Sequence, residues 1–256
     1  MGKFASGTLL CNRGAGRIGH AMSETKDVCV VAGVGPGIGA SLARRFGTAG
    51  YPVALLARST ELSERLAKEL PKAKAYTCDV ADPAAVERAY RAIRADLGAI
   101  GVLAYNASTG AFVNIEAATA EDFERTWRVN TFGAFLAAKQ VIPEMIAAGR
   151  GSIVFIGATA SRKGGARSPA LSSAKFAQRG LAESMARHLG PRGIHVAVVV
   201  VDGVVDLART RAFMKDKPDD FFIRPDDVAA TVLHLAEQPR SAWSFEVEAR
   251  PFGETW

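Results

Sequence analysis

The sequence predicts an α/β protein in which one domain is built around a doubly wound, parallel sheet. Short apolar segments rich in β-branched residues alternate with amphipathic helical segments, which is the pattern of repeated strand–helix–strand units. The apolar segments are nearly uninterrupted, as at 196–201, and this is typical of strands that helices cover on both faces. The chain has 256 residues, of which 48% are hydrophobic, and no linker divides it, so we expect one full-sized core.

The elements follow one another in a regular order. A β-branched run at 28–33 predicts the first strand, and apolar residues at helical spacing follow it until Gly50. Ser59 or Thr60 can cap the second helix, and Pro83 suits the first turn of the third. The predicted strands are 28–33, 51–58, 73–80, 100–108, 151–158, 194–203 and 243–249, and the predicted helices are 38–50, 59–70, 82–98, 119–148, 169–189 and 224–238.

Residues 1–25 differ from the rest of the chain. They are rich in glycine and have little hydrophobic periodicity, so we expect a disordered extension ahead of a single folded domain at 26–256. The letters at 14–19, GAGRIG, match a dinucleotide-binding pattern, but no strand precedes them and no apolar helix follows. The opening letters MGKFAS match a myristoylation pattern, again without supporting context.

Composition narrows the classes of function. No segment approaches the ~18 consecutive apolar residues of a membrane-spanning helix, so no membrane partner is expected. The net charge is +6, but no stripe of basic and aromatic residues accompanies it, so nucleic acid is not expected as a partner. The three cysteines form no ligand-like cluster and the four histidines show no metal-ligand spacing. We therefore expect no metal, and free thiols in a reducing cytoplasm.

A glycine-rich turn joins the first strand to the first helix. Glycines stand at Gly33, Gly35, Gly37 and Gly39, and Ile38 opens the helix. A tight turn requires Gly33, close approach of the backbone to a pyrophosphate requires Gly37, and Gly39 allows the helix to pack against the strand. The helix N-terminus then offers N–H groups and a positive dipole end to phosphate. The turn predicts a dinucleotide site; a glycine-rich turn without a ligand is the alternative.

The end of the second strand indicates which nucleotide is bound. NAD sites usually carry an acidic residue there for the ribose 2′-hydroxyl, whereas this sequence has Arg58, whose guanidinium favours a 2′-phosphate. NADP is therefore the predicted cofactor, and NAD is the alternative if Arg58 is only a solvated surface residue. Asp79 and Val80 lie at the end of the third strand, and Asn106 and Ala107 end the fourth. Ligands of such sheets bind at these carboxyl ends, so all four are candidate cofactor contacts.

Together these motifs resemble those of the short-chain dehydrogenase/reductase superfamily from about Val28 to the C-terminus. The resemblance rests on the glycine turn, Asn106-Ala107-Ser108, Val129-Asn130, 151–154 and 188–196. It implies a Rossmann fold of about seven strands, a nicotinamide cofactor and hydride transfer between a carbonyl and an alcohol. It also implies a small-molecule substrate and assembly as a homodimer or homotetramer.

The catalytic tetrad that the resemblance implies is incomplete. Asn130 matches the family's asparagine, which anchors a water relay. Lys175 matches the lysine, which holds the nicotinamide ribose and lowers the pKa of a catalytic tyrosine. The tyrosine position is Leu171, and the serine position is Ala158. The resemblance therefore places an atypical active site in this chain.

The segment after the sixth strand departs from the family as well. The usual Pro-Gly is replaced by Asp202-Gly203, and the threonine that often follows and contacts the carboxamide falls near Leu207. The resemblance still implies that Asp202 and Gly203 contact the cofactor.

The two missing hydroxyls have a chemical consequence. A positioned general acid typically contributes about 10²–10⁴-fold, whereas the gain from aligning hydride donor and acceptor can remain. Either the substrate needs no acid from the protein, or a neighbouring hydroxyl substitutes. Thr159 is the first candidate, and the others are Ser161, Ser168, Ser172 and Ser173.

The favoured function is an NADP(H)-dependent oxidoreductase acting on a small carbonyl or alcohol. The alternative is an inactive nucleotide-binding homologue that serves as a sensor or partner subunit.

Overall fold

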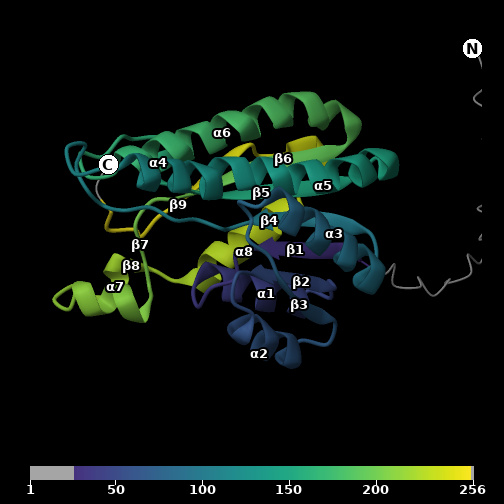
Figure 1. Ribbon diagram of the computed structural model, residues 1–256. Coiled ribbons are helices and arrows are strands. Elements are labelled where there is room, and N and C mark those ends of the chain that lie inside the picture. The colour runs from purple at the N-terminus through teal and green to yellow at the C-terminus, as the bar shows by residue number, and fades with distance from the viewer. Residues whose placement is uncertain (1–25, 255–256) are drawn as a thin grey trace, which may run out of the picture.

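Seven strands form the central sheet (Figure 1). The structure is a computed structural model, and it describes residues 26–254. Within them the strand order is β3-β2-β1-β4-β5-β6-β9 and every neighbouring pair is parallel, which confirms the predicted doubly wound sheet. The strands are β1 (Val28–Ala32), β2 (Val53–Ala57), β3 (Ala73–Thr77), β4 (Ile100–Tyr105), β5 (Gly151–Ala158), β6 (Ile194–Val201) and β9 (Glu246–Ala249).

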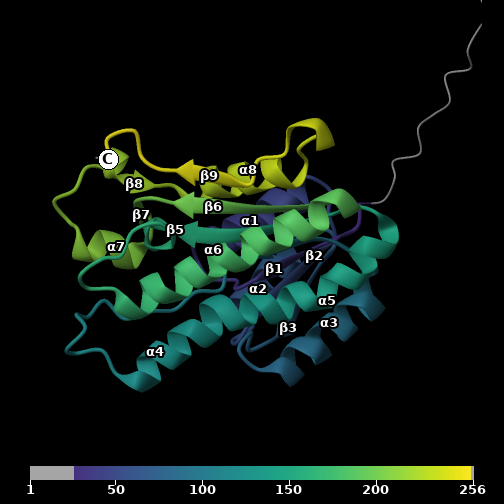
Figure 2. The same cartoon turned by 90° about the horizontal axis from the view of Figure 1, so that it is seen from above.

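Helices cover both faces of this sheet, and Figure 2 shows one of the two layers from above. One apolar cluster joins the sheet to α3, α5 and α6, and a second cluster on the other face joins it to α1, α2 and α8. These helices are α1 (Ile38–Thr48), α2 (Glu61–Glu69), α3 (Pro83–Leu97), α5 (Gly133–Ala148), α6 (Pro169–Leu189) and α8 (Pro225–Ala236). All eight residues of β6 are buried between the layers, as their apolar sequence predicts.

The direction of winding reverses between β1 and β4. From β1 the chain moves outward to β2 and β3, then returns to β4 on the other side of β1 and continues to β5 and β6. Open α/β sheets bind their ligands at the carboxyl ends of the strands beside such a reversal. Ala32 pairs with Tyr105 at the ends of the two strands, so Gly33 and Asn106 leave the sheet side by side.

Local signals in the sequence account for several element ends. The Asp82 side chain accepts the N–H of Ala84 and so caps α3, with Pro83 as its first residue. Gly50 adopts a φ of 88° just after α1, a conformation that glycine takes most readily. Thr60 precedes α2 as predicted, but its hydroxyl donates to the Glu64 carboxylate, so the expected side-chain cap is wrong.

Two regions differ from the sequence-based prediction. The helical zone at 119–148 consists of α4 (Ala120–Trp127), a π-helical turn at Arg128–Phe132, and α5. Between β6 and α8 the chain forms α7 (Ala208–Phe213) and a small sheet of β7 (Val204–Val205) and β8 (Phe222–Ile223), none of which was predicted. Strands of two residues are too short to show an alternating pattern.

Some predictions fall on residues that the structure does not describe. The extension at 1–25, with both of its motif matches and Cys11, lies outside the described residues. Within 26–254, Cys29 and Cys78 are buried and free. In the same range no helix has the length and apolar character needed to cross a membrane, and no three or more His, Cys, Asp or Glu side chains gather as a metal site would require.

Candidate functional site

The glycine turn after β1 brings three backbone segments into close contact. Gly33 has a φ of 98°, and a Cβ added there would lie 2.4 Å from the backbone nitrogen of Ala107. A Cβ on Gly39 would lie 2.5 Å from the Gly33 carbonyl oxygen. That same oxygen accepts a hydrogen bond of 2.7 Å from Nδ2 of Asn106. The turn, the start of α1 and the end of β4 therefore form one rigid unit, and only glycine fits at Gly33 and Gly39.

The start of α1 leaves its backbone open. Gly37 precedes the helix and no described side chain caps it. The N–H of Ala40 donates to the Gly35 carbonyl oxygen at 3.0 Å, and no described group accepts the N–H groups of Ile38 and Gly39. A Cβ on Gly35 would have no described atom within 4 Å. A Cβ on Gly37 would instead lie 2.5 Å from Cδ2 of Leu207, which comes from the segment after β6. The close approach at Gly37 was predicted for a pyrophosphate, and in this structure a leucine side chain makes it.

A hollow of about 500 Å³ adjoins this turn at the end of β2, lined by Val34, Ala57, Arg58 and Ser59. Arg58 is exposed beside it, at the position where the sequence predicts contact with a ribose substituent. At the end of β3, Asp79 accepts the N–H of Ala81, whereas the neighbouring Val80 is buried. These groups lie in line along the carboxyl ends of β1, β2 and β3.

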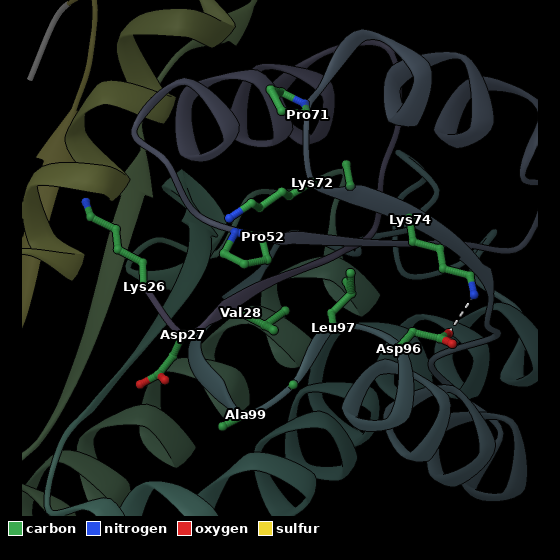
Figure 3. Close-up of a pocket in the computed structure, with 12 residues that line it drawn as sticks. Lys26, Asp27, Val28, Pro52, Pro71, Lys72, Lys74, Asp96, Leu97 and Ala99 are labelled. Carbon is green, nitrogen blue, oxygen red and sulfur yellow. Dashed lines mark ion pairs between the residues drawn. The ribbon is translucent and has the colours of Figure 1, made fainter. Parts of the chain in front are cut away.

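A second hollow, of about 600 Å³, lies at the opposite end of the strands, where β1, β2 and β3 begin (Figure 3). It is formed around the start of β1 and the ends of α2 and α3, and its lysines include Lys26 and Lys74. Lys74 pairs with Asp96 at 2.8 Å, and Lys26 pairs with Glu237 at 2.6 Å. Helix carboxyl ends disfavour anions, and none of the predicted site residues reaches this end, so we do not assign the cofactor to it.

Asn130 lies in the π-helical turn, fully buried, with its side chain held by three hydrogen bonds. Nδ2 donates to the carbonyl oxygens of Thr109 at 2.7 Å and Thr126 at 2.9 Å. Oδ1 accepts from the hydroxyl of Ser108 at 2.7 Å. The side chain thus ties the loop after β4 to the helix, and its main-chain carbonyl remains for another partner.

That partner is Gln178, which connects Asn130 to Lys175. Nε2 of Gln178 donates to the Asn130 carbonyl at 2.6 Å, and its Oε1 accepts from Nζ of Lys175 at 3.2 Å. Nζ also donates to the carbonyl of Ile156 in β5 at 2.8 Å. Lys175 is buried, and this burial lowers its pKa from 10.5 to about 7. Asn130 and Lys175 are therefore connected through Gln178, a residue that the sequence analysis did not identify.

The two positions without hydroxyls are also well packed. Leu171 lies one helical turn before Lys175, and a Cβ on Gly110 would lie 3.2 Å from its Cβ, so this side chain contacts the loop after β4. Ala158 ends β5, and its N–H donates to the hydroxyl of Ser161. The other serines also have local partners: Ser168 lies 3.0 Å from Ser172, and Ser173 donates to the carbonyl of Pro169.

Thr159 follows Ala158, and its hydroxyl is bound to Asp202. Oγ1 donates to Oδ1 of Asp202 at 2.5 Å, and the other carboxylate oxygen lies 3.6 Å from Nη1 of Arg250. Gly203 comes next with a φ of 151°, and a Cβ there would lie 2.8 Å from Pro251. The predicted residues Thr159, Asp202 and Gly203 therefore lie together, packed against the segment after β9. Arg250 belongs to this cluster and was not predicted.

Comparison with known proteins identifies the family. A family model described as short chain dehydrogenase matches residues 27–218. The chain belongs to this family. D-threitol dehydrogenase of Mycolicibacterium smegmatis is 30% identical over 221 residues, covering 82% of this chain and 85% of the relative. Momilactone A synthase of Oryza sativa subsp. japonica is 34% identical over 226 residues, covering 82% of each chain.

Solved structures of the short chain dehydrogenase family share the fold. A short-chain dehydrogenase from Rhodopseudomonas palustris matches with a TM-score of 0.76 and 31% identity, covering 88% of this chain and 99% of that one. A metagenomic short-chain oxidoreductase in complex with NADP matches with a TM-score of 0.77 and 29% identity, covering 89% and 98%. The chain is therefore an oxidoreductase of this family, with a nicotinamide dinucleotide as cofactor and a small molecule as substrate.

Proposed function

We propose that this protein is an NADP(H)-dependent oxidoreductase that interconverts a small organic carbonyl compound and its alcohol. The observation that carries the proposal is the arrangement along the carboxyl ends of β1, β4 and β5. There the uncapped start of α1 lies on one side, and the buried Asn130 and Lys175 lie on the other. A dinucleotide that reaches from one to the other has its phosphates at a helix N-terminus and its reactive end beside the lysine.

The preference for NADP follows from Arg58. Its exposed guanidinium borders the 500 Å³ hollow at the end of β2, where a carboxylate would be expected for NAD. A planar, permanently charged guanidinium binds a phosphate through paired hydrogen bonds. The metagenomic oxidoreductase with bound NADP, at 29% identity, supports the same choice.

The remaining cofactor contacts follow the strand ends. When bound, the nicotinamide ring supplies or accepts the hydride. Leu207 covers Gly37, so its side chain turns aside when the pyrophosphate binds. We assign the contacts to the phosphates to Gly33, Gly35, Gly37, Ile38 and Gly39, those to the adenosine to Arg58, Asp79 and Val80, and those to the nicotinamide riboside to Asn106, Ala107, Lys175, Asp202 and Gly203.

We further propose that the active site works without the family's tyrosine and serine. Leu171 and Ala158 have no hydroxyl to offer, and Thr159 is the neighbouring hydroxyl best placed to replace the serine. Its bond to Asp202 fixes the rotamer of Thr159 and leaves the oxygen lone pairs to accept a hydrogen bond from a substrate hydroxyl other than the one that is oxidised. A carboxylate acceptor also polarises the hydroxyl, which strengthens any hydrogen bond that the hydroxyl oxygen accepts.

The test of this function is direct. Calorimetry with NADPH and NADH on the purified full-length chain should give binding of both, with NADPH bound more tightly. Oxidation of NADPH should then follow on addition of aldehydes and ketones from a broad panel. Binding of NADPH with neither reduction of any carbonyl by NADPH nor oxidation of any alcohol by NADP⁺ would favour the inactive sensor or partner subunit instead. The absence of binding to either nucleotide would refute the proposal.

We propose a homodimer or homotetramer, with 26–256 as the nucleotide-binding domain and the cytoplasm as the compartment. Large apolar side chains are exposed along the helix layer that Figure 2 shows in front, namely Phe123, Trp127 and Phe135 on α4 and α5, and Phe176 on α6. Apolar patches of this kind commonly mark protein interfaces. Sedimentation of the wild-type chain, compared with a Trp127→Glu variant, should show an assembly that the added charge dissociates.

A further inference from the structure

The nitrogen of Lys175 has two permanent acceptors. The carbonyl oxygen of Ile156 lies 2.8 Å from Nζ, and the Oε1 of Gln178 lies 3.2 Å from it. Neither oxygen can donate a proton, so each requires an N–H from the lysine. No other hydrogen bond among the described residues involves this nitrogen.

This arrangement fixes the position of the exchangeable proton. An ammonium has three N–H groups, and a neutral amine has two N–H groups and one lone pair. Because the two acceptors take two N–H groups in either state, the proton that is gained and lost occupies the third position on Nζ. The hydroxyl that the family places one helical turn earlier is absent here, because that residue is Leu171.

Gln178, which accepts a hydrogen bond from Nζ of Lys175, is itself held in a fixed orientation. It is 1% exposed, and its Nε2 donates to the Asn130 carbonyl at 2.6 Å. That bond determines which end of the amide faces the lysine, since the end that donates to a carbonyl must be the nitrogen. The oxygen of Gln178 therefore always faces Lys175, and through it the π-helical turn at Arg128–Phe132 sets the position of the lysine.

No charged side chain competes for this nitrogen among the described residues. The elements packed against this part of α6 are β5, β6, α4, α5, the π-helical turn and the short turn at Thr159–Ser161. The ionisable side chains of these elements and of the residues next to them have other partners or are exposed. The charged pairs are Asp202 with Arg250, Asp122 with Arg125, Glu124 with Arg128 and Glu144 with Arg94, and on α6 itself Arg179 with Glu246. His195 lies between the carbonyl oxygens of Leu235 and Ser244, and Glu121 and Lys139 are exposed. Burial alone lowers the pKa of Lys175 to about 7, so both protonation states are populated near neutral pH.

We propose that Lys175 is the proton donor and acceptor of this active site, and that Gln178 positions it for that role. The inference rests on the proposed oxidoreductase function. In the reducing direction, the substrate carbon receives the hydride supplied by the reduced nicotinamide and the C=O π bond breaks. The oxygen takes the proton that leaves the third position of Nζ. Lys175 is left as a neutral amine and is reprotonated from solvent; oxidation of the alcohol reverses each step.

The first test needs no turnover. Carbon NMR of protein labelled with [ε-¹³C]lysine follows each lysine through a pH titration, and the Lys175 signal is the one missing from Lys175→Met. We expect its midpoint near 7, whereas exposed lysines titrate at about 10.4. Gln178→Glu should raise the midpoint by about 1–3 units, because it places a carboxylate against the ammonium. Gln178→Met, which keeps the side-chain length, should lower the midpoint. The matched control, Gln140→Glu, adds the same charge on α5 and should leave it unchanged.

The second test couples this titration to catalysis. In single-turnover oxidation of NADPH by a carbonyl substrate, the wild-type rate should fall as pH rises through the Lys175 midpoint, and in Gln178→Glu the fall should move to higher pH by the same interval. A Lys175 midpoint near 10 in the wild type would overturn the inference whatever the activity. A neutral midpoint with a rate profile that does not move in Gln178→Glu would overturn it and leave the proposed function standing. The lack of any carbonyl turnover by wild-type protein would refute both.

Discussion

The hydroxyl of Thr159 donates to the carboxylate of Asp202 across 2.5 Å, at the point where β5 and β6 end. Asp202 directly follows β6, and it lies beside the guanidinium of Arg250 from the segment after β9. Asp202 thus connects the candidate substrate-binding hydroxyl to the segment that follows the last strand of the sheet.

Removing that hydroxyl should weaken the fold and the activity together. Thr159→Val keeps the shape but leaves one oxygen of the buried Asp202 without its donor. We expect a loss of about 1–3 kcal/mol in the free energy of unfolding, measured by urea denaturation, because the bond involves a charged group. Thr159→Ser retains the donor and should stay close to wild type in stability and in carbonyl reduction. Equal stability of the valine variant and the wild type would contradict a structural role for this bond.

Arg58→Asp should discriminate between the two cofactors. The substitution removes the guanidinium from the hollow at the end of β2 and supplies the carboxylate typical of NAD sites. A hydrogen bond to a charged group contributes about 1.5–3 kcal/mol, so NADPH affinity should fall about 10–100-fold while NADH affinity holds or improves. Calorimetry measures both. Arg65→Asp, on the exposed side of α2, is the matched control; a parallel loss of both affinities in Arg58→Asp would argue against a 2′-phosphate contact.

The glycines of the turn should separate stability from cofactor binding. Gly33→Ala places a Cβ 2.4 Å from the Ala107 nitrogen at a positive φ, and the backbone conformation alone costs about 1–3 kcal/mol. Gly35→Ala meets no described atom within 4 Å and should fold normally. If phosphate approaches this backbone closely, however, NADPH affinity should fall in Gly35→Ala. Thermal unfolding and calorimetry together give both readouts, and full NADPH affinity in Gly35→Ala would exclude a close phosphate contact there.

Lys175 should make the stability of the protein depend on pH. Its pKa is about 7 in the folded chain and close to its ordinary value of 10.5 after unfolding. Between these values the unfolded chain binds the extra proton, so the free energy of unfolding contributed by this group rises with pH, by up to about 1.4 kcal/mol per unit. The difference in unfolding free energy between wild type and Lys175→Met, measured from pH 6 to pH 10, should show this rise. A difference that stays flat would mean that the lysine keeps its ordinary pKa in the folded state.

Restoring the family's hydroxyls should increase activity. Leu171→Tyr combined with Ala158→Ser places a phenol one helical turn from Lys175, with the new ring passing Gly110. We expect faster NADPH-dependent carbonyl reduction by about 10²-fold or more, within the contribution of a positioned acid. Leu171→Phe with Ala158→Ser supplies the same ring without the hydroxyl and should show no such gain. An equal rate in the two variants would show that the phenol does not reach the substrate.

The sheet and its helices were predictable because their signals are local and repeated. The uninterrupted apolar run of β6 and the glycine turn before α1 need no knowledge of distant residues. The resemblance also singled out Asn130 and Lys175 as candidate site residues, and Gln178 connects the two. Gln178 was missed, although it stands three residues after Lys175 on the same helical face, where a polar residue facing the core could have been noticed.

Contacts between distant parts of the chain could not be predicted from the sequence. No residue near Gly37 in the sequence predicts that Leu207 contacts it, because the two residues are 170 positions apart along the chain. Arg250 was not predicted as a site residue for the same reason: it contacts Asp202 only because β6 pairs with β9. The short β7 and β8 depend on pairing with each other and carry no pattern of their own.

The place of β9 in the chain has a consequence for synthesis on the ribosome. β6 is apolar at nearly every position, and one of its two edges is completed by a strand made only about fifty residues later. A nascent chain in which β6 has just left the ribosome therefore has an unpaired, apolar strand edge while translation continues. Premature release at that stage favours aggregation, and holding chaperones would act on this intermediate before the final strand arrives.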